Sequence, residues 1–275
     1  MLNNFKHFLR SLNYKESDYI ATDDDSLKLF WWNGQVNLGD VINLELVKTL
    51  SKKKVEWVPN NYSQEFNTCI GSVLQLANNH TTVWGSGYIS EAARSPKKPK
   101  MVCAVRGPKT RQLLLAQGVE CPEVYGDPAL LAPMLFPINE MKKYELGIIP
   151  HFVDKKAAFF QQQFPDNIKI IDIETDDVNQ FLSEVNQCEK IISSSLHGVI
   201  LADAYGIPAH RVKFSNDISG GDFKFEDYYL SVKREIIKPV YIDKNTTIDS
   251  IMNMGFDYSI DIDTSQLLEA CPFKG

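Results

Sequence analysis

Short apolar runs alternate with amphipathic helical patterns along the chain from Leu27 to Ile242. Several runs are almost continuously apolar, which is typical of parallel strands that helices cover on both faces. The predicted strands are Leu27–Trp31, Thr68–Ile70, Thr82–Trp84, Met101–Val105, Leu146–Ile149, Ile168–Ile173, Lys190–Ser193, Arg211–Phe214 and Val240–Ile242. The predicted helices include Val41–Leu50, Lys109–Gln117, Asp177–Gln187 and Leu196–Tyr205. This regular alternation of strand and helix favours the α/β class over α+β.

The alternation is interrupted at Pro133, Pro137 and the polar residues that follow them. We therefore predict an N-terminal α/β domain over residues 1–137 and a C-terminal α/β domain over residues 138–245, facing each other across a cleft. Residues 246–275 are predicted to close the chain as a pair of short helices.

Composition narrows the class of protein. The 275 residues are 44% hydrophobic and 23% charged, as in globular proteins. The formal net charge of −6 argues against a nucleic-acid binder, although a local group of Arg and Lys still allows an anionic substrate. The five cysteines form no CxxC pair, which favours a reducing compartment over a zinc site or a disulfide framework.

No targeting or metal-binding segment is predicted. Residues 1–20 lack the apolar run of a signal peptide, and no window approaches the roughly 20 apolar residues of a membrane span. The acidic run Asp23–Asp25 contains a DxD pattern, but such runs are usually solvated loops. We therefore expect a cytoplasmic protein without a bound metal.

The segment Ile191–Ile200 is the strongest candidate site. A short apolar strand runs into Ser193, Ser194 and Ser195, and the helix that follows has His197 in its first turn. Hydroxyl groups, free backbone N–H groups and the positive end of a helix dipole together suit a bound anion. The imidazole can both give and take a proton near neutral pH, so His197 is the predicted general acid.

Asp40 allows two interpretations. It ends the segment Asn37-Leu38-Gly39-Asp40, between a predicted strand and the helix Val41–Leu50. Asp is a preferred N-cap residue, so its carboxylate can serve the helix alone. The same carboxylate at the carboxyl end of a strand could instead act as a base toward a hydroxyl group.

Two further junctions carry candidate ligand contacts. Three cations lie at a predicted strand-to-helix junction: Arg106, Lys109 and Arg111. They are either solvated or bind an anion. Gly85 and Ser86 form a glycine turn after a strand, but Ser90 stands where a dinucleotide fingerprint needs its third glycine. The turn therefore predicts close backbone approach to a ligand, not a nicotinamide or flavin cofactor.

Taken together, these segments resemble the polysaccharide pyruvyltransferase family, in particular its bacterial branch of exopolysaccharide ketal-pyruvate transferases. The matching segments are Phe30-Trp31-Trp32, Asn37-Leu38-Gly39-Asp40, Val83-Trp84-Gly85-Ser86-Gly87, Val105-Arg106-Gly107-Pro108, Tyr125-Gly126-Asp127-Pro128-Ala129, Ile149-Pro150-His151, Ser193-Ser194-Ser195-Leu196-His197-Gly198, Ala202-Asp203-Ala204-Tyr205-Gly206-Ile207-Pro208 and Phe223-Lys224-Phe225-Glu226-Asp227-Tyr228-Tyr229.

The resemblance implies two Rossmann-like halves facing a cleft, as in GT-B glycosyltransferases. It also implies transfer of a pyruvyl group from phosphoenolpyruvate to a sugar of a surface or exopolysaccharide repeat unit, forming a pyruvate ketal. No cofactor beyond this donor and no obligatory metal is implied. The acceptor would be a lipid-linked oligosaccharide, which the protein would reach by transient association with the inner face of the membrane.

On this reading, His197 and Asp40 are the catalytic residues. The residues assigned to the donor are Arg106, Ser193, Ser194, Ser195, Gly85, Ser86, His151 and Lys224. Many family members have Arg where this chain has Ser195, and a hydroxyl group cannot neutralise charge. Neutralisation of the phosphate would then fall to other cations, and Arg106 is the predicted clamp, with Arg111, Arg211, Lys213 and Lys224 as further candidates.

Two alternative functions would use the same sequence features. A GT-B-like glycosyltransferase would bind a nucleotide sugar, because fold alone does not fix the chemistry. A non-catalytic carbohydrate-binding or assembly protein would use the aromatic residues as a sugar platform; these are Trp31, Trp32, Trp84, Tyr228 and Tyr229.

Overall fold

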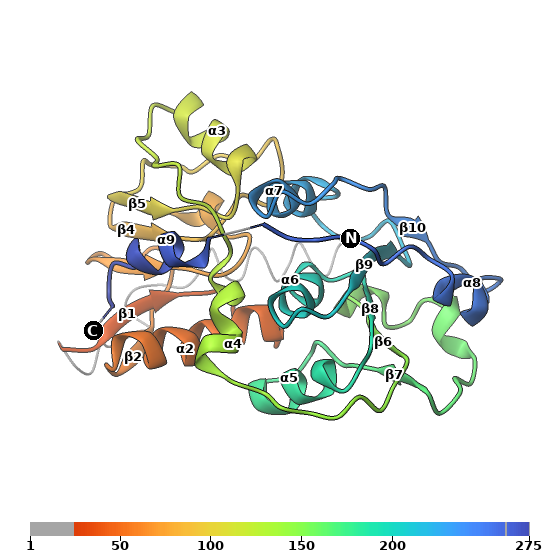
Figure 1. Ribbon diagram of the computed structural model, residues 1–275. Helices are drawn as coiled ribbons and strands as arrows, with labels where there is room; N and C mark the ends of the chain where they lie inside the picture. Colours follow the sequence, from red (N-terminus) through yellow and green to blue (C-terminus); the bar gives the residue numbers. More distant parts are fainter. Residues whose placement is uncertain (1–24, 262, 275) are drawn as a thin grey trace.

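The computed structural model describes residues 25–261 and 263–274, so Asp23 and Asp24 of the acidic run lie outside the described residues. It contains two sheets of five strands each (Figure 1). The first has the order β2-β1-β3-β4-β5 and consists of β1 (Leu27–Phe30), β2 (Val55–Trp57), β3 (Phe66–Thr68), β4 (Thr81–Trp84) and β5 (Met101–Ala104). The second has the order β10-β9-β8-β6-β7 and consists of β6 (Leu146–Ile149), β7 (Ile168–Ile170), β8 (Ile191–Ser193), β9 (Ala209–Lys213) and β10 (Val240–Tyr241). We call the parts that carry these sheets the N-terminal and C-terminal halves.

Helices connect the strands in both halves (Figure 1). The α-helices are α2 (Leu38–Ser51), α3 (Pro108–Ala116), α4 (Ala132–Leu135), α5 (Val178–Asn186), α6 (Leu196–Ala204), α7 (Phe223–Ser231), α8 (Ile248–Met252) and α9 (Thr264–Glu269). Short 3₁₀ turns are η2 (Leu74–Leu76), η3 (Pro128–Leu131), η4 (Phe152–Asp154) and η5 (Ala158–Gln161). Among the described residues, no helix combines the length and apolar character needed to cross a membrane.

Neighbouring strands run parallel in both sheets, which confirms the predicted α/β class and agrees with two Rossmann-like halves. Every predicted strand and helix is present at least in part. The pattern did not predict β2, which has only three residues, or α7. Aromatic residues have low helix propensity, and α7 is held by its packing against α3, a contact that is invisible in the local sequence.

One apolar core joins the two halves. It contains Leu38 and Ile42 of α2, Leu130 of η3, and Leu196 and Val199 of α6, all buried. The side chains that α2 and α6 direct into it come from the same two helices whose first turns carry Asp40 and His197. Apolar packing therefore fixes the distance between the two predicted catalytic residues.

The end of the chain returns to the N-terminal half. The helix α9 lies beside β4 (Figure 1), where Trp84 Nε1 donates a hydrogen bond of 2.8 Å to the carbonyl oxygen of Leu267. The ring of Phe273 meets the ring of Trp84 edge-on, with centroids 5.4 Å apart. Together with α8, this helix forms the predicted pair of short closing helices.

Candidate active site

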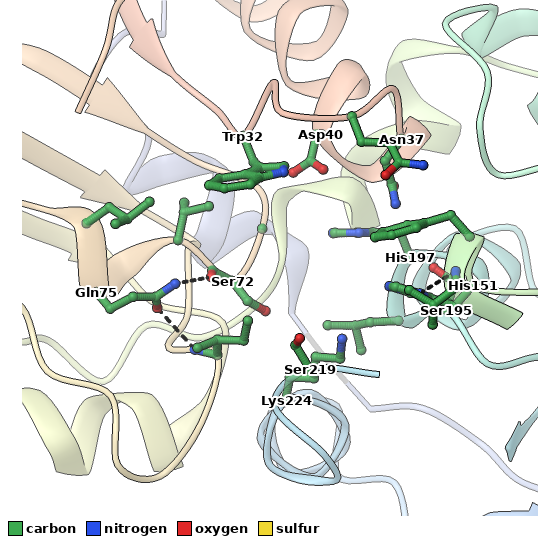
Figure 2. Close-up of a pocket in the computed structure, with 18 residues that line it drawn as sticks. Trp32, Asn37, Asp40, Ser72, Gln75, His151, Ser195, His197, Ser219 and Lys224 are labelled. Carbon is green, nitrogen blue, oxygen red and sulfur yellow. Dashed lines mark hydrogen bonds between the residues drawn. The ribbon is translucent and has the colours of Figure 1, made fainter. Parts of the chain in front are cut away.

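A cavity of about 300 Å³ lies between the two halves (Figure 2). Its walls are the loops that follow β1 and β3 on one side and β6 and β8 on the other, so it opens at the carboxyl ends of both parallel sheets. The lining residues are Trp32, Gln35, Asn37, Asp40, Gly71, Ser72, Val73, Gln75, Leu76, Ile89, His151, Phe152, Val153, Ser195, Leu196, His197, Ser219 and Lys224. The structure thus brings Asp40, His151, Ser195, His197 and Lys224 together, although the sequence separates them widely.

Asp40 is free to act in the cavity because another residue caps its helix. The N-cap of α2 is Asn37, whose Oδ1 accepts a hydrogen bond of 2.9 Å from Gly39 N. Burial raises the pKa of Asp40 to about 7, against the lowering influence of His197 and Lys224. A carboxyl group with this pKa can take up and release a proton at neutral pH. The structure thus assigns the cap to Asn37 and not to Asp40, and the role of Asp40 as a base stays a prediction.

His197 lies in the first turn of α6 and faces the first turn of α2. A Cβ atom added at Gly39 would lie 1.9 Å from His197 Nδ1, so only glycine allows the two helices to approach this closely. On the other side of the ring, Nε2 is 3.5 Å from Oδ2 of Asp127. Neither of these buried atoms has a hydrogen-bond partner among the described residues.

Lys224 brings positive charge to the cavity from the first turn of α7. Burial lowers the pKa of Lys224 to about 8, together with Arg106 and Arg211, while Asp40 and Asp154 oppose this shift. The ammonium group is therefore charged at neutral pH but close to losing its proton.

His151 follows β6 and lines the same cavity. Burial lowers the pKa of His151 to about 3, and the nearby Lys224 and His197 lower it further. Its Nδ1 accepts a hydrogen bond of 3.4 Å from Val153 N. At neutral pH this imidazole is uncharged, so it can bind a ligand by a hydrogen bond but cannot neutralise one.

Arg106 does not line the cavity, contrary to the predicted direct clamp. Its guanidinium group is fully buried and donates to Oδ2 of Asp227 (3.0 Å), to Ser72 Oγ (2.7 Å) and to the carbonyl oxygen of Tyr88 (2.7 Å). Asp227 also accepts a bond of 2.9 Å from Thr110 N at the start of α3. The anion at this junction is thus a carboxylate of the protein itself, contributed by α7.

The other two cations of that junction are also paired within the protein. Lys109 forms an ion pair with Glu226, and Nη1 of Arg111 lies 3.1 Å from Oε1 of Glu123. Arg106 reaches the cavity only through Ser72, which accepts its hydrogen bond and lines the wall.

Of the three predicted serines, only Ser195 lines the cavity. Ser193 Oγ lies 2.9 Å from the carbonyl oxygen of Ile149, and its hydroxyl oxygen accepts a bond of 3.0 Å from Ser195 N. Ser194 donates to Oδ2 of the buried Asp154 (2.6 Å) and accepts from His151 N (2.9 Å). These two hydroxyl groups hold the loops in place, since internal bonds already use them.

Gly85 and Ser86 also lie away from the cavity wall. Pro128 packs against Gly85, which has a φ of +90°, so a Cβ atom there would lie 2.2 Å from the proline ring. Ser86 Oγ donates to the carbonyl oxygen of Cys69 at 2.7 Å. A Cβ atom at Gly87 would lie 2.4 Å from Arg106 Cζ. The protein itself fills the space around this turn, which leaves no room for the pyrophosphate of a dinucleotide.

Sequence reasoning missed three buried acids around the site: Asp127, Asp154 and Asp227. Asp127 had a usable signal, because it stands in Tyr125-Gly126-Asp127-Pro128, a short polar motif between apolar segments. Asp227 stands in one of the family-like segments, but nothing in the sequence pairs it with Arg106, which is 121 positions away. Within the described parts of the chain, no group of His, Cys, Asp and Glu side chains is arranged to hold a metal ion.

Comparison with known proteins identifies the family. A model described as polysaccharide pyruvyl transferase matches residues 3–216. "Uncharacterized protein L143" of Acanthamoeba polyphaga mimivirus is 30% identical over 259 residues, which cover 90% of this chain and 88% of that protein. "Succinoglycan biosynthesis protein ExoV" of Rhizobium meliloti (strain 1021) is 28% identical over 208 residues, which cover 74% of this chain and 64% of that protein. Asp40, His151 and His197 all lie within the range that the family model matches, and the chain belongs to the polysaccharide pyruvyl transferase family.

Proposed function

We propose that the protein transfers a pyruvyl group from phosphoenolpyruvate to a sugar of a surface or exopolysaccharide repeat unit and forms a pyruvate ketal. One observation carries the proposal: Asp40, His197 and Lys224 meet in a single cavity between the two halves. They offer a proton acceptor, a proton donor and a cation, which are the groups that this reaction needs. The two parallel-sheet halves on either side of the cavity also fit a GT-B-like arrangement.

The donor would bind against the C-terminal half. Its carboxylate and phosphate need positive charge, and Lys224 is the lysine that lines the cavity, with buried Arg106 and Arg211 close enough to act on its charge. Ser195 is the N-cap of α6 but makes no side-chain capping bond. Its hydroxyl group and the helix N-terminus are thus available to phosphate oxygens. Lys224 takes over the direct clamp that the sequence assigned to Arg106.

The acceptor would bind against the N-terminal half, where part of the wall is apolar. Trp32, Val73, Leu76 and Ile89 form this part, and Figure 2 shows Trp32 at the same side of the cavity as Asp40. An aromatic ring with apolar neighbours suits the C–H face of a sugar ring. The sugar would belong to a lipid-linked oligosaccharide that the protein meets at the inner face of the membrane.

The chemistry then follows from these positions. The protonated imidazole of His197 gives its proton to the methylene carbon of the donor, and a sugar hydroxyl group adds to the central carbon while Asp40 accepts its proton. Phosphate leaves, and the second hydroxyl group attacks the same carbon to close the ketal. Of the two hydroxyl protons, one replaces the proton that went to the new methyl group, and the other leaves with phosphate. Holding both hydroxyl groups against one carbon removes a large entropic cost.

Calorimetric titration with phosphoenolpyruvate tests the donor, with UDP-sugars as the comparison. We expect phosphoenolpyruvate to bind and Lys224→Ala to weaken the binding about tenfold or more. Lys109→Ala is the matched control, because Lys109 is paired with Glu226 and is not part of the cavity wall. Binding of a UDP-sugar without phosphoenolpyruvate would overturn the proposal in favour of a glycosyltransferase. Binding of an oligosaccharide alone would favour a carbohydrate-binding protein.

Measurements of turnover distinguish a loss of donor binding from a loss of the chemical step. With phosphoenolpyruvate and a polysaccharide acceptor, His197→Ala should abolish release of inorganic phosphate while the folded structure and donor binding persist. Phosphate release at the wild-type rate would remove His197 from the reaction.

A further inference from the structure

We propose that Asp127 is a positioning residue that holds His197 through Nε2 and so presents the reactive nitrogen, Nδ1, to the substrates. The inference deepens the proposed function and rests on it for the role of His197. The arrangement of the two side chains can nevertheless be tested without any substrate.

Among the described residues, the Asp127 carboxylate has a hydrogen-bond partner for only one of its two oxygens. Asp127 is fully buried at the N-cap of η3, where Oδ1 accepts a hydrogen bond of 3.0 Å from Ala129 N. Capping therefore uses one oxygen and leaves Oδ2 without a partner. Buried carboxylate oxygens nearly always have a donor, so an orphaned one implies a specific neighbour that completes it.

The neighbour that faces this orphaned oxygen is His197. His197 Nε2 is 3.5 Å from this oxygen and is itself buried without a partner. Two orphaned atoms of complementary type thus face each other across a gap slightly longer than a hydrogen bond. Catalytic hydrogen bonds are often long in a site without substrate and shorten when the substrate binds.

The imidazole ring of His197 cannot turn away from Asp127. The helix α6 packs against η3, so Asp127 and His197 belong to two elements in contact. On the opposite side, Gly39 lies so close to Nδ1 that an added Cβ atom would overlap it at 1.9 Å. The ring is confined between the backbone of α2 and the carboxylate of Asp127.

This confinement fixes the tautomer of the His197 imidazole. With Nε2–H donating to Asp127, the neutral imidazole keeps its lone pair on Nδ1, and the protonated imidazole carries its transferable proton there. Nδ1 lies beside Gly39, and residues on either side of Gly39 in the chain, Asn37 and Asp40, both line the cavity. Asp40, His151 and Lys224 line the same cavity as His197, and the charge of His197 acts on Asp40 and His151.

The test replaces Asp127 without removing the cap. Asp127→Asn keeps Oδ1 for Ala129 N but can place an amide N–H group against Nε2, which would force the opposite tautomer. Asp127→Ser caps η3 without reaching the imidazole. Asp177→Asn is the matched control, because Asp177 caps α5 through a bond to Gln180 N, outside the cavity wall.

Nitrogen-15 NMR of the histidine side chains reads the tautomer directly, and His197→Gln assigns the signal. In the unmodified protein, at a pH where His197 is neutral, we expect the proton on Nε2; Asp127→Asn should move it to Nδ1, and Asp177→Asn should change nothing. A proton on Nδ1 in the unmodified protein, or an Asp127→Asn protein with an unchanged tautomer, would overturn the inference. Neither result depends on whether phosphoenolpyruvate is the donor.

Kinetics supply the second measurement. We expect Asp127→Asn to lower kcat by about 10²-fold or more, with a KM for phosphoenolpyruvate close to that of the unmodified protein. A merely structural cap would predict no loss, because asparagine caps as well as aspartate. Unchanged kcat in an active enzyme would therefore also overturn the inference. If no form of the protein releases phosphate from phosphoenolpyruvate, the proposed function fails while the NMR result still decides the role of Asp127.

Discussion

At the scale of single residues, the site depends on ionisable groups that burial has shifted toward neutral pH. The pKa of Asp40 is raised to about 7 and that of Lys224 is lowered to about 8, in both cases chiefly because the groups are buried. Each group stabilises the charge of the other, since Lys224 lowers the pKa of Asp40 and Asp40 raises that of Lys224. Perturbed groups that meet in a cavity are a physical mark of an active site.

These pKa values predict a bell-shaped pH dependence. The base Asp40 must be deprotonated, so kcat/KM should rise as the pH passes through about 7. Lys224 must be protonated, so kcat/KM should fall as the pH passes through about 8. The free-enzyme groups determine this quantity, and steady-state rates measured from pH 5 to 10 would show both limbs.

Lys224→Arg provides the control for the alkaline limb. A guanidinium group keeps its charge throughout this range, so the part of the fall near pH 8 that Lys224 causes should disappear while the acid limb stays. An alkaline limb that is the same in both proteins would show that Lys224 does not cause it.

The close approach of Gly39 to His197 makes a second prediction. Gly39→Ala should lower kcat strongly, because the new methyl group would occupy the position of the imidazole ring and displace it. Donor binding by Lys224 should change little, so the calorimetric affinity for phosphoenolpyruvate is the companion measurement. Gly255→Ala, at a glycine with no atom within 4 Å of an added Cβ, is the control and should behave as the unmodified protein. Full activity in Gly39→Ala would contradict the packing of α2 against His197.

At the scale of secondary-structure elements, α7 links the two halves. It supplies Lys224 to the cavity, and one turn later Asp227 bonds to Arg106 and caps α3 of the N-terminal half. The approach is close, because a Cβ atom at Gly107 would lie 1.9 Å from the carbonyl oxygen of Asp227. Two of the three cations predicted to meet an anion, Arg106 and Lys109, thus anchor the helix that carries Lys224.

Asp227→Ala should therefore destabilise the protein severely. It leaves Arg106 fully buried without its carboxylate, and breaking a buried ion pair costs about 3–5 kcal/mol of unfolding free energy. Glu226→Ala, one residue earlier, removes only the partly exposed pair with Lys109 and should cost about 0–1 kcal/mol. Urea unfolding of both variants measures the difference.

A double variant isolates the cause. Replacing both buried partners by apolar residues, as in Arg106→Met with Asp227→Leu, removes the unpaired charge and should recover part of the lost stability. If the double variant were less stable than Asp227→Ala, the bonds of Arg106 to Ser72 and Tyr88 would outweigh the cost of its unpaired charge.

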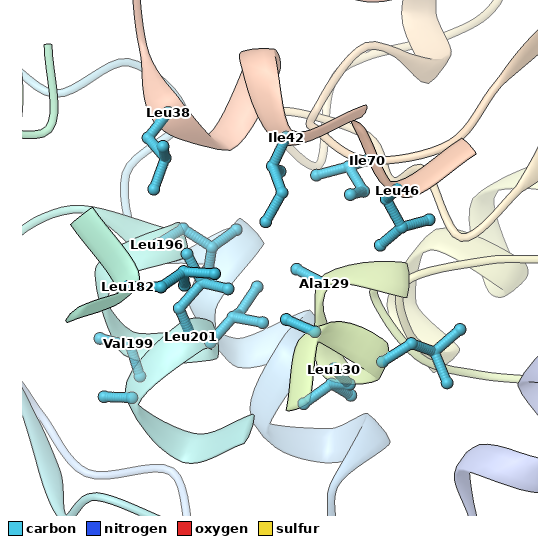
Figure 3. Close-up of a cluster of buried hydrophobic side chains, with 14 of the residues drawn as sticks. Leu38, Ile42, Leu46, Ile70, Ala129, Leu130, Leu182, Leu196, Val199 and Leu201 are labelled. Carbon is cyan, nitrogen blue, oxygen red and sulfur yellow. The ribbon is translucent and has the colours of Figure 1, made fainter. Parts of the chain in front are cut away.

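At the scale of the whole molecule, the two halves share a core and are not independent units. Figure 3 shows Leu38, Ile42 and Leu46 of α2 facing Leu196, Val199 and Leu201 of α6. Ala129 and Leu130 of η3 lie against the same cluster. Opening the space between the halves would expose this cluster to water, which the hydrophobic effect opposes.

The shared core predicts a single unfolding transition. The four tryptophans, Trp31, Trp32, Trp57 and Trp84, all lie in the N-terminal half, so their fluorescence reports on that half alone. Leu201→Ala alters the C-terminal side of the shared core and should cost about 2–5 kcal/mol, since Leu201 is fully buried. In a cooperative molecule this substitution shifts the tryptophan transition and the circular dichroism transition together. A tryptophan transition that does not move would show that the halves unfold separately.

The local pattern of the sequence determined the fold class and which segments reach the cavity between the halves. Hydrophobic periodicity is a local property, so it predicted most of the strands and helices, and the exceptions are β2, α4 and α7. Parallel strands end at one edge of their sheet, and the segments after β1, β6 and β8 therefore carry Asp40, His151 and His197 as predicted. The ordered motifs also predicted the family, which the family model confirms.

Only the tertiary structure decided which polar groups meet. The sequence left Asp40 between cap and base, and the structure shows that Asn37 is the cap. The sequence showed that Arg106 needs an anion, but not that Asp227 is that anion, 121 positions away. In the same way, Asp127 meets His197 only because η3 packs against α6. Such pairs depend on how two separately predictable sheets pack together, and that packing is set by the shared apolar core and not by any local pattern.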